Sequence, residues 1–164
     1  MTTSAAAIRD LCLAAIEALT PRTLAHDRFE RHRADLQGGQ TFEDWLTKNP
    51  QQLRRFIVRD DGNRSAPPVM GGDYQRERVT FDVVVAYPLT NRYGAGGSRD
   101  LDKVIEEDER QIDYAIGAFG SATFGTDTSP LVNDQVPAWR TQETDSGVML
   151  LLGRVGFEFW RTAP

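Results

Sequence analysis

One segment constrains the fold of this chain more than any other. Residues 79–87 read VTFDVVVAY, so Val79, Phe81, Val83, Val85 and Tyr87 share one side of an extended chain. This period of two is that of a β-strand with one strongly apolar face. A face of that kind must be covered, so other segments of the chain are expected to pack against it.

Two amphipathic segments can supply the cover. Residues 4–19 place apolar side chains at the helical spacing, and Pro21 follows as a terminator. Residues 100–119 repeat the pattern before Gly120, with Asp108 as the one charged residue on the apolar stripe. The sequence predicts a helix over each segment. Cys12, on the first stripe, is interpreted as a small core residue.

The remaining elements are shorter. The sequence predicts an edge strand at 26–33, a short helix from Thr41 to Pro50, and a strand at 53–59 ended by a turn at Asp61–Gly62. It also predicts a hairpin of 136–144 with 147–160. We expect an α+β fold, with a single mostly antiparallel sheet and two long helices packed on one face. Residues 1–164 are expected to form a single domain, with flexible loops at about 63–75 and 91–98.

Composition excludes several classes of protein. The chain has 164 residues, a formal net charge of −5 and one cysteine. An internal disulfide is therefore impossible, and general nucleic-acid binding is not expected. No apolar run approaches the roughly 20 residues that a membrane span needs, so no membrane association is expected.

The charges are unevenly distributed along the chain. Residues 20–64 contain nine Arg and Lys against seven Asp and Glu, whereas residues 100–145 contain three against eleven. One interpretation is a subunit interface based on charge complementarity; the other is two ordinary solvated faces. The candidate interface residues are Arg54, Arg55, Arg59, Arg64, Asp102, Glu106, Glu109 and Asp113.

The last four of these residues follow helical spacing and form one carboxylate ridge. Such a ridge could bind a hard cation if another segment added oxygen ligands, but the helix also offers i,i+4 ion pairs typical of a solvated face. In a ring-shaped assembly the ridge could instead line the lumen and keep passing DNA from adhering.

No catalytic site is recognisable in the sequence. The segment YGAGG at 93–97 follows a strand and precedes a helix, but Arg99 stands where a dinucleotide-binding motif needs its third glycine. His26 and His32 lie in a charged segment without an activated Ser or Cys. We expect no catalytic, metal-binding or cofactor-binding residue, and therefore no enzyme.

Several segments together resemble the tail terminator proteins of long-tailed bacteriophages. They are an N-terminal helix, RRFIVR, RVTFDVVVAYP, the aspartate-rich helix DLDKVIEEDERQIDYAIGAF and the closing strand GVMLLLGRVGFEFWR. The resemblance spans most of residues 4–161 and is one of pattern and size.

The resemblance implies a structural role in the virion. Such proteins form a homo-oligomer, a hexameric ring that caps the tail tube at its final length and supplies the surface for head joining. It implies as partners the tail tube protein and a neck or head-completion protein, while DNA passes through the lumen without specific binding. The glycine loop would contact the tube or neck through Arg92, Tyr93, Gly94, Gly96 and Gly97.

Two alternatives stay open at this point. A head-completion or neck connector protein could give the same pattern of elements. A small enzyme or ligand-binding domain could also build its pocket from residues scattered through the fold.

Overall fold

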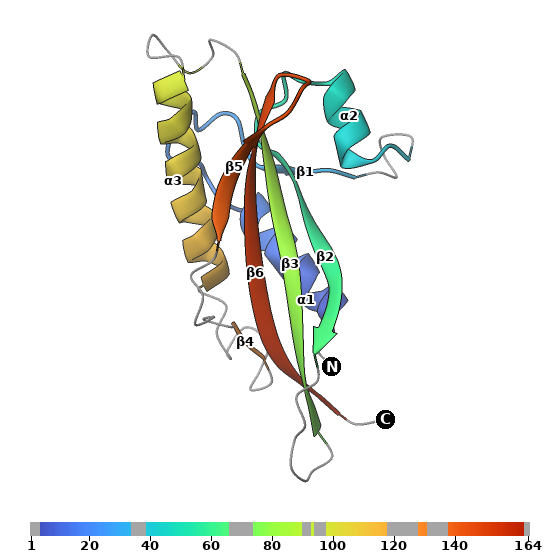
Figure 1. Ribbon diagram of the computed structural model, residues 1–164. Helices are drawn as coiled ribbons and strands as arrows, with labels where there is room; N and C mark the ends of the chain where they lie inside the picture. The colour runs from blue at the N-terminus through green and yellow to red at the C-terminus, as the bar shows by residue number, and fades with distance from the viewer. Residues whose placement is uncertain are drawn as a thin grey trace.

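The structure is a computed structural model, and it describes residues 4–33, 39–65, 74–89, 93, 98–117, 128–130 and 138–162. Three helices and six strands lie within these residues (Figure 1). In chain order they are α1 (Ala5–Glu17), β1 (Glu30–Arg31), α2 (Phe42–Lys48), β2 (Arg55–Ser65), β3 (Tyr74–Pro88), α3 (Ser98–Gly117), β4 (Thr128–Pro130), β5 (Trp139–Glu143) and β6 (Val148–Thr162).

The strands form one sheet in the order β1-β2-β3-β6-β4, with β5 pairing with β6 beside β4. Only the short β1 is parallel to its neighbour, and every other described pair is antiparallel. β3 and β6 pair along their full fifteen residues and form the centre of the sheet. The expected α+β fold with a mostly antiparallel sheet is confirmed.

The apolar face of β3 decides where the long helices pack. Phe81, Val85 and Tyr87 form one core cluster with Ile8 of α1 and Ile112 of α3. The two long helices therefore cover one face, as expected, and Figure 1 shows them on the same side of the sheet. Cys12 is fully buried in this core, which agrees with its interpretation as a packing residue.

In the described part of the chain, the opposite face is covered by α2 at one end. Thr41 caps this helix through its hydroxyl, which accepts a hydrogen bond from the backbone N–H of Asp44. Trp45 and Leu46 pack there against Val84. Farther along the strands this face carries the exposed ion pair of Arg154 with Asp82, and the pair of the exposed Arg78 with the buried Glu158.

Two expectations about strand ends are wrong. Asp61–Gly62 does not end β2; the strand continues to Ser65 through an irregularity between Asp60 and Arg64. Gly62 adopts φ +78° there, a conformation that suits glycine at a β-bulge, and its N–H binds the Asp60 carboxylate. Residues 63–65 and 74–75 consequently belong to strands, while 66–73 lie outside the described residues.

Three further differences concern short or irregular segments. Of the strand expected at 26–33, only Glu30–Arg31 pairs with β2, and the irregular chain before it buries Phe29. β4 was not expected at all, since three residues ending in Pro130 carry no strand pattern. In the glycine loop, residues 91–92 and 94–97 lie outside the described part.

Candidate functional site

Arg54, just before β2, is one of two charged residues of the described chain that have no exposed surface. Its exposed fraction is 0 %, and its backbone adopts φ +59°, which is uncommon for a residue other than glycine. Its N–H binds the carbonyl of Ala86 at 2.8 Å, and its own carbonyl accepts from Glu30 at 3.1 Å. The backbone is thus held at the meeting point of β1, β2 and β3.

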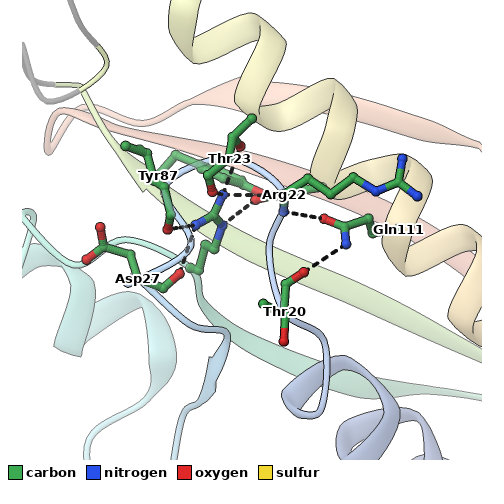
Figure 2. Close-up of polar contacts among 9 residues, drawn as sticks. Thr20, Arg22, Thr23, Asp27, Tyr87 and Gln111 are labelled. Carbon is green, nitrogen blue, oxygen red and sulfur yellow. Dashed lines mark hydrogen bonds and ion pairs between the residues drawn. The ribbon is translucent and has the colours of Figure 1, made fainter.

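All five N–H donors of the Arg54 guanidinium are used within the chain. Nε and Nη2 bind the two carboxylate oxygens of Asp108 at 2.6 and 3.0 Å. The other three donors bind the carbonyl oxygens of Leu24, Asp27 and Thr23 at 3.0, 2.8 and 2.7 Å. Figure 2 shows Thr23, Asp27 and Tyr87 converging on this network.

Asp108 completes the network on the side of α3. It is fully buried and accepts a third hydrogen bond from the Tyr87 hydroxyl at 2.9 Å. Burial raises the pKa of Asp108, against the opposing effect of Arg54 and Tyr87. Burial, together with the charge of Asp108, also raises the pKa of Tyr87 well above its usual range. Tyr87 therefore remains a protonated donor throughout the physiological range.

The same helix holds the connection between α1 and β1 at a second point. The Gln111 side chain accepts from the N–H of Arg22 at 3.1 Å and donates to the carbonyl of Thr20 at 3.0 Å (Figure 2). The Arg22 guanidinium pairs with Glu107 at 2.9 Å. Residues 20–27 are thus fastened to α3 along one side, and Arg54 fastens them to the sheet.

These contacts change the set of candidate interface residues. Arg54 has no donor left for a second copy of the chain, so we remove it from the candidate interface. Arg55 is also buried: its guanidinium lies 4.4 Å from the centre of the Trp45 ring and pairs with Glu30 at 3.0 Å. We remove Arg55 as well, because its side chain is buried within the chain.

The other two arginines lie farther along β2. Arg59 is 46 % exposed and pairs with Glu43 of α2. The burial of Glu43 would raise its pKa, but the hydrogen bond and charge of Arg59 outweigh this and lower it. Arg64 belongs to β2, and the placement of its side chain is outside the described structure. Arg59 therefore remains a candidate at the surface.

The carboxylate ridge is present on the outer side of α3. Asp102, Glu106 and Asp113 are exposed and Glu109 is half-buried. Burial and then the neighbouring charges of Asp113 and Glu106 raise the pKa of Glu109, as expected for carboxylates that share a ridge.

The ridge also has partners within the chain. Glu106 pairs with Arg110 at 2.6 Å, and Asp113 accepts from the indole N–H of Trp139 at 3.3 Å. Among the described residues no group of three or more His, Cys, Asp or Glu side chains is placed to hold a metal ion.

Tyr93 is buried, whereas the sequence predicts it as a surface residue of the glycine loop that contacts the tube or neck. Its side chain is 7 % exposed and belongs to the core cluster beneath the long helices. We therefore remove Tyr93 from the candidate tube or neck contact. Arg92, Gly94, Gly96 and Gly97 lie outside the described residues, so their expected role stays a prediction.

The two edges of the sheet form surfaces that the sequence reasoning did not single out. Among the residues that the structure describes, β5 pairs with β6 alone, and all its residues after Trp139 are exposed. On the other side β1 pairs with β2 at Arg55 and Phe56 only, so within the described chain β2 has no partner strand outside from Ile57 onward. The edge strands of a sheet are the surfaces at which another strand can be added.

Comparison with protein-family models and with curated proteins found no family and no relative that matches this chain. Within the described residues, no helix is both long and apolar enough to cross a membrane.

Proposed function

We propose that this protein is a structural component of a bacteriophage virion, a tail terminator whose subunits form a hexameric ring. The ring caps the tail tube when the tube reaches its final length, at the end of the tail nearest the head. Its free surface then joins the neck or head-completion protein, and DNA passes through the lumen without specific binding. The protein acts by assembly, without catalysis.

The observation that carries this proposal is the presence of two unlike open edges on opposite sides of one sheet. A ring needs heterologous contacts, in which one surface of a subunit meets a different surface of the next. β5 offers one such surface, and β2 beyond Phe56 offers the other. The resemblance of residues 4–161 to tail terminators supports the same conclusion.

The acidic ridge of α3 suits this role. Asp102, Glu106 and Asp113 are exposed on a helix that covers one face of the sheet. In a ring, that helical face points either to the lumen or to the outside. In the lumen its negative charge repels the DNA backbone and lets DNA pass without adhering.

Interruption of the gene in a phage that carries it tests the proposal by electron microscopy of the lysate. A terminator is required to stop tube growth, so we expect tails of irregular, excessive length and filled heads without tails. Tails of normal length beside unjoined heads would indicate a neck connector instead. Normal, joined particles would contradict a structural role.

A further inference from the structure

An apolar recess lies between α2 and the turn that joins β5 to β6. It has a volume of about 420 Å³, and Leu46 of α2 and Leu150 of β6 are among the residues that line it. Figure 1 shows α2 and this turn at the same end of the sheet. The recess therefore lies at one end of the strands.

Leu46 and Leu150 form an apolar floor. Leu46 is buried in the small core cluster beneath α2, and Leu150 packs against this cluster but is only half-buried. Part of the Leu150 side chain therefore still faces water. An apolar side chain placed in the recess would cover this surface, and removing apolar surface from water is favourable.

The rim of the recess carries two carboxylates. Glu43 and Asp145 belong to the lining residues, and the described lining contains no Arg or Lys. Arg59 pairs with Glu43 from outside the recess. Asp145 is exposed and has no ion-pair partner among the described residues. The open charge of the rim is therefore the Asp145 carboxylate, which favours a cation in a bound partner.

A second recess beside α2 lacks this combination. It is lined by Gly39, Gln40, Thr41, Asp44, Thr47 and Lys48. This lining has no large apolar side chain, and it carries charges of both signs. An apolar floor next to an unpaired carboxylate thus distinguishes the recess between α2 and the β5–β6 turn.

We propose that this recess binds a protein segment in which an apolar side chain lies next to an arginine or lysine. The apolar side chain packs on Leu46 and Leu150, and the cation pairs with Asp145 at the rim. An apolar centre with a polar rim is the usual composition of a protein–protein contact.

The position of the recess relates it to the proposed ring. Subunits that join through their sheet edges leave the ends of their strands free, so the ring would present the recess once per subunit at one of its two ends. The bound segment would then belong to the protein that abuts this end. This assignment of the partner rests on the proposed function, whereas the chemistry of the recess does not.

Capped dipeptides test this chemistry in the folded chain. Ac-Leu-Arg-NH2 carries both features, Ac-Leu-Glu-NH2 replaces the cation by a carboxylate, and Ac-Gly-Arg-NH2 lacks the apolar side chain. Each is titrated into methyl-labelled protein, in which the methyl resonances of Leu46 and Leu150 report on the floor by NMR, also in a large assembly. We expect these resonances to shift with Ac-Leu-Arg-NH2, and its binding to be about two- to fivefold tighter than that of Ac-Leu-Glu-NH2.

Equal shifts with all three dipeptides, or no shift of either leucine at any soluble peptide concentration, would overturn the proposed chemistry. The solution mass of the same sample is measured in parallel. A ring that does not bind would overturn the recess and leave the proposed ring standing. Binding by a monomer would overturn the ring and leave the recess standing.

Two carboxylate variants separate Asp145 from a general effect of charge. Asp145→Asn should remove the preference for Ac-Leu-Arg-NH2 over Ac-Leu-Glu-NH2, because the cation then loses its partner. Asp44→Asn is the matched control, since Asp44 is also exposed but lines the second recess. An unchanged preference in Asp145→Asn, or an equal loss in Asp44→Asn, would contradict the pairing with Asp145.

Discussion

Arg54 shows how a single charged residue can organise several segments at once. Its guanidinium is held by Asp108 of α3 and by three carbonyls of residues 23–27. Removing it would leave the Asp108 carboxylate buried without its counter-ion, and breaking a buried pair in this way costs about 3–5 kcal/mol. The network therefore joins the α1–β1 connection, the sheet and α3.

We expect Arg54→Met to lower the free energy of unfolding by about that amount, as measured by urea denaturation. Tyr87→Phe is the milder comparison, because it removes one donor to Asp108 and should cost about 1–2 kcal/mol. Arg54→Met combined with Asp108→Leu should recover part of the loss, since no charge then stays buried. A single Arg54→Met protein as stable as the wild type would contradict the role of this pair.

Two buried groups predict the response to alkaline pH. Burial raises the pKa of Cys12 from 9.0 to about 12, and that of Tyr87 is also raised. Both groups ionise at a lower pH in the unfolded chain than in the folded protein. Their contribution to the free energy of unfolding is therefore complete below pH 9 and is lost as pH rises toward 12.

We therefore expect the free energy of unfolding to fall with pH above 9, and the fall to be shallower in Cys12→Ala. Urea denaturation across this range measures both slopes. Equal slopes in the two proteins would show that Cys12 is not protected by the fold.

At the scale of elements, the contact between β5 and β6 depends on a glycine. A Cβ at Gly153 would overlap the Trp139 ring, whose Cη2 atom would lie only 2.6 Å away. Gly153→Ala should displace this indole and cost about 1–3 kcal/mol through overpacking. Urea denaturation followed by tryptophan fluorescence measures the change. Restored stability in Gly153→Ala with Trp139→Leu would identify the indole as the obstacle, whereas an unaffected Gly153→Ala protein would contradict the contact.

The hydrogen bond from the N–H of Thr144 to the carbonyl of Val148 determines which backbone groups of β5 point to β6 and which point to the open edge. This alternation gives a prediction that uses two adjacent residues. The N–H of Thr141 points to the open edge, whereas that of Gln142 points to β6. Thr141→Pro should therefore preserve most of the stability of the isolated subunit while blocking pairing with another chain, as proline is tolerated at an open edge. Gln142→Pro should destabilise the hairpin itself. Thermal unfolding that ranks the two variants in the opposite order would show that the phase is wrong.

Periodicity made most elements predictable. The alternation at 79–87 and the stripes at 4–19 and 100–119 anticipated β3, α1 and α3, because one strongly apolar face permits few arrangements. The predicted strand end at Asp61–Gly62 is wrong, because a dipeptide that ends a strand in a hairpin also fits a bulge inside a longer strand.

The contacts between distant residues could not be predicted in this way. Asp108 stood out as a charge on an apolar stripe, which signalled a buried partner without identifying it. Arg54 is 54 positions away in sequence, and only the packing of α3 on the sheet brings the two together. Tyr93 carried a similar signal, as the one aromatic residue in a glycine-rich segment.

At the scale of the whole molecule, the proposed ring would be built from a single kind of subunit through two different edges of one sheet. In the proposed ring each copy would use its β5 edge and its β2 edge once, so the contacts would all be equivalent. Closure of the proposed ring would cover both edges and remove the risk of uncontrolled pairing.

Native mass spectrometry of the chain tests the proposed ring most directly. The account predicts one closed species with the mass of six chains, without a series of longer assemblies. A monomer at every soluble concentration, or an open series that grows with concentration, would contradict the account.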